Sequence, residues 1–187
     1  MWYTIYERWR ETPQTRKGKG MRSDYITRAK KFIPALDEML SDNFKNKYLI
    51  QQYIRAYNYT HRRNVIFSHG LTRYAFITSD YVIKIDYDEY EVENFGGCEQ
   101  EYELYQNAVV DGMEYLFAEI TPFMYNNKVY YIMPRIKGIG KTDDDATRYM
   151  NRKERQWCRS YDLGDLHSFN YGWRNKHICI IDYAAHS

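Results

Sequence analysis

The spacing of apolar residues changes along the chain, and the first part has the period of helices. Apolar side chains there recur every three or four positions, which predicts two helices. The first runs over about 24–40, and the second runs from Ser41 or Asp42 to about Tyr59. Pro34 lies inside the first helix, so we expect it to kink that helix or split it in two.

From Asn64 onward, the pattern becomes short runs rich in β-branched and aromatic residues, which is typical of strands. The runs NVIF, YAFIT and YVIKIDY predict three antiparallel strands over 64–67, 74–78 and 81–87. A helix opened by two glycines is expected over 96–110. Two further strands follow, joined at Asn126-Asn127, which is a strong hairpin signal.

The last part of the chain predicts one more helix and one more hairpin. A loop is expected over 138–145, a helix over 145–161, and a two-stranded hairpin around Arg174-Asn175. Helices mixed with short antiparallel strands indicate the α+β class.

The charge of the chain is small in sum but unevenly distributed. The chain has 27 Lys and Arg against 25 Asp and Glu, yet residues 1–63 hold 14 of the former and 6 of the latter. A basic segment of this kind can bind nucleic acid, an acidic partner, or the acidic remainder of its own chain. Nucleic acid bound through residues 1–63 is therefore an open alternative, although not the favoured one.

Cysteine usage and hydropathy indicate a reducing, aqueous compartment. Cys98, Cys158 and Cys179 are far apart and form no CxxC pair, so neither a zinc site nor a disulfide framework is predicted. No apolar run reaches the length of a membrane span, and the N-terminus lacks the apolar core of a signal peptide. We expect a cytoplasmic protein without a membrane partner.

Acidic and amide side chains near the C-terminus have spacings that folding alone does not explain. Asp165 lies in a Gly-Asp-Leu-His turn, Asn170 follows five residues later, and Asp182 ends an apolar run. Transfer of a phosphoryl group from ATP needs a carboxylate to orient the acceptor hydroxyl and oxygen ligands for Mg²⁺. Asp165 is the candidate base, and Asn170 and Asp182 are candidate metal ligands. Upstream, Lys84 and Glu101 are the candidate phosphate-binding lysine and its acidic partner.

These elements occur in the order found in the protein kinase fold and its aminoglycoside and choline phosphotransferase relatives. GDLHSFN resembles the catalytic loop of that superfamily, IIDYA its metal-binding Asp-Phe-Gly element, and YVIKI the strand that bears its lysine. EQEYELY resembles the helix whose glutamate pairs with that lysine, with Glu101 the first candidate and Glu99 the second. VYYIMPRI resembles the strand leading into the hinge, where backbone groups from Met133 to Arg135 would meet adenine.

The sequence departs from that family in two places. The family covers the phosphates with a glycine-rich loop, whereas SHGLTRYAF has Gly70 alone, so Ser68, Thr72 or Arg73 would have to supply part of this contact. Without that role, Arg73 would be a solvated loop residue. The sequence has only five residues after Asp182, and the resemblance therefore implies a minimal, truncated C-lobe. In this respect the chain is similar to the very compact kinase-like proteins of tailed bacteriophages.

The resemblance divides the chain into two parts. Residues 1–63 would be an accessory region of a basic arm and helices, and residues 64–187 a minimal kinase-like domain. Within that domain, 64–136 would form the N-lobe and 137–187 a reduced C-lobe. The expected fold is thus α+β and protein-kinase-like, with a small antiparallel N-lobe sheet and an extra N-terminal helical region.

The function implied by the resemblance is ATP- and Mg²⁺-dependent phosphoryl transfer. A protein of the host cell, in its cytoplasm if the chain is phage-encoded, is the favoured acceptor, because the reduced C-lobe leaves little room for a small-molecule pocket. The aminoglycoside-like GDLH sequence favours a small molecule instead. The alternative is a weak or inactive pseudokinase that binds and inhibits a host protein. The single loop glycine favours that alternative, and the complete set of five candidate polar residues opposes it.

Overall fold

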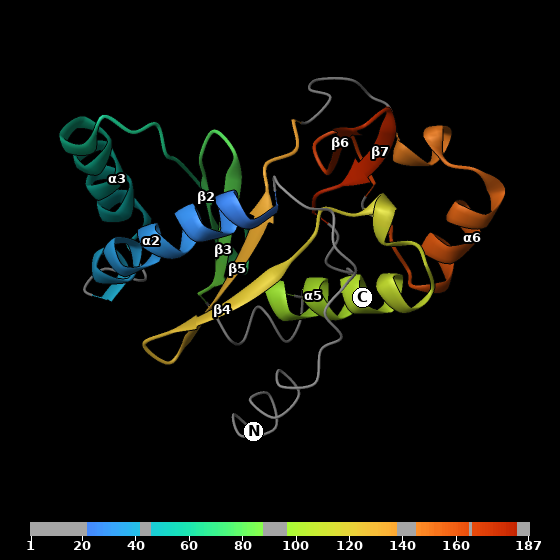
Figure 1. Ribbon diagram of the computed structural model, residues 1–187, viewed down its shortest axis with the longest axis horizontal. Coiled ribbons are helices and arrows are strands. Elements are labelled where there is room, and N and C mark those ends of the chain that lie inside the picture. Colours follow the sequence, from blue (N-terminus) through green and yellow to red (C-terminus); the bar gives the residue numbers. More distant parts are fainter. Residues whose placement is uncertain (1–21, 42–45, 88–96, 138–144, 165, 183–187) are drawn as a thin grey trace.

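The structure is a computed structural model that describes residues 22–41, 46–87, 97–137, 145–164 and 166–182. The basic arm and most of the loop expected over 138–145 lie outside these ranges. Within them, helices and strands follow one another largely in the order that the sequence predicted, around a small antiparallel sheet. The expected α+β class is therefore confirmed (Figure 1).

A five-stranded antiparallel sheet lies at the centre of the molecule. Its strands are β1 (Ile66–His69), β2 (Arg73–Ile77), β3 (Tyr81–Asp86), β4 (Thr121–Tyr125) and β5 (Lys128–Pro134). They lie in the order β1-β2-β3-β5-β4, which makes β3 the middle strand. The β4–β5 turn is formed by Asn126 and Asn127, both with positive φ (46° and 60°), as a two-residue hairpin loop requires.

One long helix, α2 (Arg22–Ser41), packs along one face of this sheet, against β3, β4 and β5. Its buried stripe is formed by Ala29, Phe32, Ile33, Leu36 and Leu40. The predicted split at Pro34 is wrong, because the helix continues through that residue. An internal proline costs about 3 kcal/mol, and burial of the continuous apolar stripe offsets this cost.

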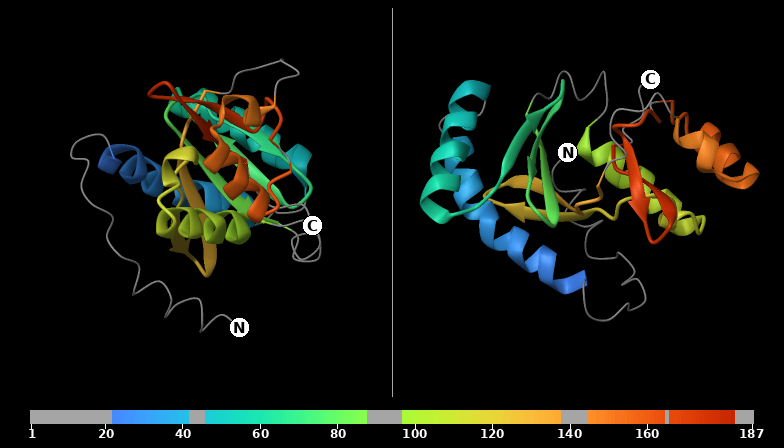
Figure 2. Two further views of the ribbon diagram at one scale, coloured as in Figure 1. Left: turned by 90° about the vertical axis from the view of Figure 1, so that its right-hand side faces the viewer. Right: turned by 90° about the horizontal axis from the view of Figure 1, so that it is seen from above.

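The second helix, α3 (Lys47–His61), lies on the same side of the sheet and contacts β1 and α2 (Figure 2). It begins later than predicted, because the side chain of Asn46 caps it by accepting a hydrogen bond from Leu49 N at 3.2 Å. Asp42, one of the two predicted starts, lies outside the described residues.

Alternation along β3 divides its side chains between two cores. Tyr81, Ile83 and Ile85 join α2 and α3 in one core, here called the helix-side core. Val82 and Lys84 face the opposite way, toward the second core. Helices α2 and α3, which belong to the region 1–63 expected to be accessory, therefore share a core with the middle strand of the sheet.

The second core lies between the other face of the sheet and the C-terminal part of the chain (Figure 2). Its elements are α5 (Cys98–Val110), η1 (Glu114–Leu116), η2 (Ala146–Tyr149), α6 (Arg152–Ser160), β6 (Tyr171–Arg174) and β7 (His177–Ile180). The β6–β7 hairpin is tied to the chain after η1 by a parallel bridge between Phe117 and Ile180, in which Ala118 N donates to Ile180 O at 2.8 Å.

Two predictions for this C-terminal part are wrong. The helix predicted over 145–161 is two separate elements, because Asn151 and Glu154 form a capping box that starts α6 afresh. Asn151 Oδ1 accepts from Glu154 N at 3.0 Å, and Glu154 Oε2 accepts from Asn151 N at 2.6 Å. The last hairpin turns at Asn175-Lys176, one residue later than predicted, with φ values of 52° and 67°.

The three cysteines are buried free thiols, as expected without a disulfide framework. Burial raises the pKa of Cys158 to about 12 and that of Cys179 to about 11, so both stay protonated at neutral pH. None of the helices in the described ranges combines the length and the apolar character needed to cross a membrane.

Candidate active site

Four charged side chains meet on the α5 side of the sheet. They are Lys84 of β3, Glu101 of α5, Arg73 of β2 and Asp182 of the segment after β7, here called the ion cluster. Lys84 Nζ donates to both carboxylate oxygens of Glu101, at 3.0 and 2.9 Å, and lies 3.5 Å from Asp182 Oδ1. Arg73 Nη2 donates to Asp182 Oδ1 at 2.9 Å, and Arg73 Nη1 lies 3.0 Å from Glu101 Oε1.

The position of Glu101 follows from the way β3 is joined to α5. Asp86 at the end of β3 accepts hydrogen bonds from Cys98 N, the first residue of α5, at 3.0 and 3.1 Å. A carboxylate at this place accepts a hydrogen bond from an otherwise unpaired N–H group, and its negative charge interacts favourably with the positive end of the helix dipole. Glu101, in the first turn, then faces β3, whereas Glu99 is exposed. Of the two candidates, Glu101 is thus the one in contact with Lys84.

Exposure differs strongly among the four members of the ion cluster. The side chains of Glu101 and Lys84 are 1% and 8% exposed, and that of Arg73 is 13% exposed. Asp182 is 42% exposed, so it forms the side of the cluster that a ligand can reach.

The two acids of the ion cluster respond differently to these surroundings. Burial raises the pKa of Glu101 to about 7, although Lys84 and Arg73 act in the opposite direction. Burial also acts to raise the pKa of Asp182, but the charges of Lys84 and Arg73 outweigh it and hold that pKa below its usual range. Asp182 is therefore fully ionised at neutral pH, while Glu101 is close to titration.

Arg73 is the functional candidate that the sequence described least well. The interpretation of Arg73 as a solvated loop residue is wrong, because it begins β2 and its guanidinium is largely buried. In the β2–β3 register, Arg73 lies opposite Asp86, and Ala75 lies opposite Lys84. Arg73 and Lys84 are therefore diagonal neighbours on one face, within reach of the same acids. Of the other two candidates for phosphate contact, Ser68 is exposed on β1 and Thr72 is buried, and neither belongs to the ion cluster.

The catalytic loop predicted around Asn170 is tied to Asp182 through the backbone. Asn170 O accepts hydrogen bonds from Ile181 N at 2.8 Å and from Asp182 N at 3.4 Å. Ile181 O in turn accepts from Lys84 Nζ at 3.2 Å. The structure thus brings Asn170, Asp182 and Lys84 into one neighbourhood. Asp165, the predicted base, lies outside the described residues.

The oxygen atoms predicted to bind metal are of the kind that hard cations prefer. In the described ranges, no three His, Cys, Asp or Glu side chains are arranged as a ready-made metal site. The predicted ligands are instead one carboxylate, on Asp182, and one amide, on Asn170, whose oxygens are of the kind that Mg²⁺ prefers. Asp182 is the accessible member of the ion cluster, so a cation can reach its carboxylate.

The remaining candidate residues, Met133, Gly70 and Arg135, differ in where they lie relative to the ion cluster. Met133 is buried opposite Val82, on the same face as Lys84. Gly70 closes the β1–β2 turn by donating its N–H to Arg73 O at 3.0 Å, and a Cβ there would meet nothing within 4 Å. Arg135 is not part of the ion cluster, because its N–H donates to Asp80 O at 2.9 Å and its guanidinium to Thr78 O at 2.7 Å.

A close backbone approach links the end of β5 to the strand after Asn170. A Cβ at Gly172 would lie 2.2 Å from Lys137 O and 2.8 Å from Ile136 Cγ2, so that only glycine fits there. Sequence analysis did not single out Gly172, and no local signal distinguishes it from a turn glycine. Its consequence is that Ile136 and Lys137, just after the predicted hinge, lie directly against β6.

Neither protein-family models nor curated proteins match the chain. The solved structures that are similar to it include these two. One is the Lpg2603 kinase of Legionella pneumophila bound to IP6, with 13% identity and a TM-score of 0.40 over 63% of this chain and 46% of that one. The other is APH(2″)-IIa in a ternary complex with streptomycin and ATP, with 19% identity and a TM-score of 0.29 over 59% and 36%.

The chain thus spans less than half the length of either neighbour. The first neighbour is a kinase by name, and the second is an aminoglycoside phosphotransferase. At these TM-scores, function has to be inferred from the chain's own residues.

Proposed function

We propose that this chain is an ATP- and Mg²⁺-dependent phosphotransferase of the protein-kinase-like type. The ion cluster is the observation that carries the proposal. Burying Glu101, Lys84 and Arg73 costs several kcal/mol per ion, and the apolar core around α5 does not need them. A lysine held by a buried glutamate, next to an accessible carboxylate, is the arrangement that binding of nucleotide phosphates and their metal requires.

The same residues fit the phosphates in detail. Arg73 Nη1 is buried and makes no hydrogen bond among the described residues, although it lies near Glu101. A phosphate oxygen would supply the missing acceptor and would compete with Asp182 for Lys84 and Arg73. Asp182, released from these cations, and Asn170 would then hold Mg²⁺, which neutralises the phosphate charge during transfer. Asp165 would orient the acceptor hydroxyl.

A protein hydroxyl is the acceptor that we favour, on a host-cell protein if the chain acts inside a host. Large apolar side chains are exposed next to the predicted catalytic loop, among them Phe169 (64%) and Trp173 (46%). Tyr149 is also exposed, and its ring packs edge-on against Trp173, with centroids 5.1 Å apart. Exposed aromatic side chains of this kind favour contact with a polypeptide.

A pseudokinase that binds a partner without turnover is the second candidate. Asp182 Oδ1 is already in contact with two cations, so the cluster is charge-balanced without any ligand. A cluster that stays closed would leave the fold as a rigid binding module.

Transfer from γ-labelled ATP with Mg²⁺ distinguishes the two candidates. Wild type, Lys84→Met and Asp182→Asn would be incubated with lysate proteins, with Glu38→Gln on the exposed side of α2 as the matched control. We expect labelled protein with wild type and the control, and none with the two cluster variants. Absence of transfer by wild type, with or without binding of Mg–ATP, would favour the pseudokinase. Transfer that persists in both cluster variants would contradict the role given to the ion cluster.

A further inference from the structure

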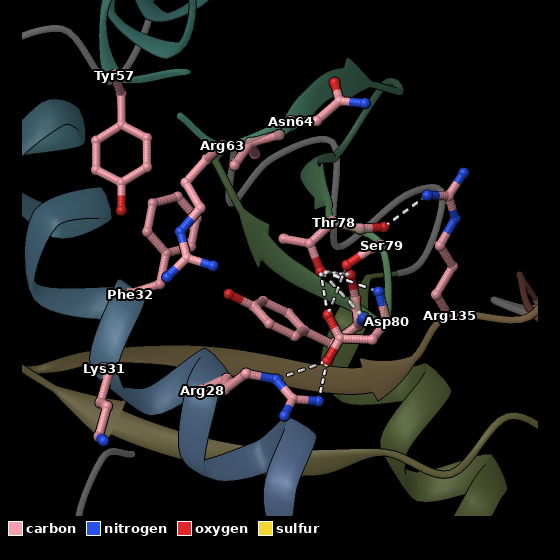
Figure 3. Close-up of a pocket in the computed structure, with 12 residues that line it drawn as sticks. Arg28, Lys31, Phe32, Tyr57, Arg63, Asn64, Thr78, Ser79, Asp80 and Arg135 are labelled. Carbon is pink, nitrogen blue, oxygen red and sulfur yellow. Dashed lines mark hydrogen bonds and ion pairs between the residues drawn. The ribbon is translucent and has the colours of Figure 1, made fainter. Parts of the chain in front are cut away.

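A hollow lies on the opposite face of the sheet from the ion cluster, beside the helix-side core (Figure 3). It is formed by α2, α3, the chain between α3 and β1, the β2–β3 turn with the first residue of β3, and the residue after β5. Its volume is about 230 Å³. It is here called the back pocket, and the residues that matter most for its chemistry are Arg28, Lys31, Phe32, Tyr57, Arg63 and Tyr81.

The inner wall of the back pocket is apolar and aromatic. Phe32 and Tyr81 are buried, and Tyr57 is half-buried. The rings of Phe32 and Tyr57 are 5.0 Å apart between centroids and tilted by 43°. Such a wall offers ring faces to a flat apolar group.

The rim of the back pocket is cationic. Arg28, Lys31, Arg63 and Arg135 line it, whereas Asp80 is the one acidic residue in its lining. Arg28 neutralises Asp80, since its Nε atom donates to Asp80 Oδ2 at 2.8 Å (Figure 3).

The other cations of the rim have no acidic partner among the residues that the structure describes. Figure 3 shows Arg63 reaching into the hollow between Tyr57 and the β2–β3 turn. Lys31 lies at its outer edge with the ammonium group directed away from Arg63, so its exposed side chain has to turn inward to share a ligand with Arg63. Burial raises the pKa of Tyr81 to about 12, so its hydroxyl is a neutral hydrogen-bond donor there. The hollow therefore combines excess positive charge with flat apolar surface.

We propose that the back pocket binds a small organic phosphate. Arg63 and Lys31 would hold the phosphate group through charge-assisted hydrogen bonds. The organic part, a compact flat ring, would lie against Phe32 and Tyr57. A volume of about 230 Å³ suits one ring with one phosphate better than a nucleoside triphosphate. This site is separate from the ion cluster and does not depend on the proposed phosphotransferase activity.

The test uses phenyl phosphate as the probe and follows backbone amide resonances of the whole chain by NMR. We expect saturable shifts at Ser79, Asp80 and Tyr81. The double variant Lys31→Gln with Arg63→Gln should bind at least tenfold more weakly. Arg55→Gln removes an exposed arginine of α3 that does not line the pocket, and it should bind as wild type does. Thermal unfolding of each variant checks that the fold is kept.

Two further probes examine the two halves of the ligand. Inorganic phosphate and phenol should each bind at least tenfold more weakly than phenyl phosphate. Equal binding of inorganic phosphate would overturn the role of the aromatic wall. Unchanged affinity in the double variant, or shifts confined to residues around Lys84, would overturn the site itself. Mg–ATP binding, measured on the same variants, should be unaffected, so this test and that of the ion cluster fail independently.

Discussion

The two faces of the central sheet use neighbouring residues of the same strand for opposite kinds of chemistry. On the face covered by α2 and α3, Ile83 and Ile85 of β3 are packed in an almost wholly apolar core. On the other face, Lys84 lies between them in sequence and meets two acids and an arginine. Apolar burial stabilises the fold, whereas burial of ions opposes it. The difference indicates that the first face maintains the fold and the second is kept for what it binds.

The helix-side core does have one buried acid, and it sharpens the comparison. Asp37 of α2 accepts from Lys128 Nζ at 2.8 Å, Asn126 Nδ2 at 2.9 Å and Tyr130 Oη at 2.6 Å. Burial acts to raise the pKa of Asp37, but these partners outweigh it and lower that pKa. Both carboxylate oxygens are occupied by the protein itself, so this acid ties α2 to the β4–β5 hairpin. Asp182, in contrast, stays open to solvent.

The largest expected effect is on the face of the ion cluster. Asp182→Asn removes the accessible carboxylate while keeping its shape, so phosphoryl transfer should fall by about 10²- to 10³-fold. Because Asp182 also balances the charges of Lys84 and Arg73, its replacement should lower the thermal unfolding midpoint as well, so activity is compared per folded molecule. Rates with Mg–ATP together with unfolding curves measure both. Wild-type activity in this variant would contradict the role given to the open acid.

A substitution in the helix-side core tests the other face of the sheet. Ile33→Ala on α2 removes a fully buried side chain and should lower the free energy of unfolding by about 2–5 kcal/mol. Activity per folded molecule should not change. Urea denaturation provides the measurement, with Glu38→Gln on the exposed side of the same helix as the control, expected within about 0.5 kcal/mol of wild type. A selective loss of activity would show that the two faces are not independent.

The pH dependence of stability tests the buried acid of the ion cluster. Burial raises the pKa of Glu101 from an ordinary 4.5 to about 7. The folded state therefore holds this proton more tightly, and the stabilisation, complete below the lower value, is lost as pH rises through the higher one. Between about pH 5 and 8, the free energy of unfolding should thus fall more in wild type than in Glu101→Gln. Parallel curves would mean that Glu101 does not titrate there.

The smallest effect concerns the connection between β3 and α5. Asp86→Ala removes the acceptor of the hydrogen bonds from Cys98 N and should cost about 1 kcal/mol of stability. Because this contact sets the position of Glu101, activity should also fall by a few-fold. Chemical denaturation and transfer rates on one preparation detect both effects. Lower stability with unchanged activity would show that Lys84 alone keeps Glu101 in place.

The parts of this architecture that could be predicted depend on local pattern. The strands follow from alternating β-branched and aromatic residues, and the β4–β5 turn from two asparagines that tolerate positive φ. The capping box at Asn151 was also readable, as an Asn-x-x-Glu sequence before a helix, although it was missed. The neighbourhood of Lys84, Glu101 and Asp182 followed from the resemblance to a known family.

The parts that could not be predicted depend on long-range packing. Arg73 contacts Asp182 across 109 residues of sequence, and only the register of β2 against β3 places it on the same face as Lys84. The alternation of β2 carried this information, but it required a correct alignment of both strands. Which face of the sheet α2 and α3 would cover had no local signal at all.

The middle position of β3 limits how the length of this chain can change. Inserting one residue before Lys84 would turn the lysine into the helix-side core and an isoleucine into the ion cluster, because successive side chains point to opposite faces. The β2–β3 turn, Thr78 to Asp80, borders the back pocket and not the ion cluster. A substitution in this turn can therefore alter what binds behind the sheet while the chemistry in front of it is left intact.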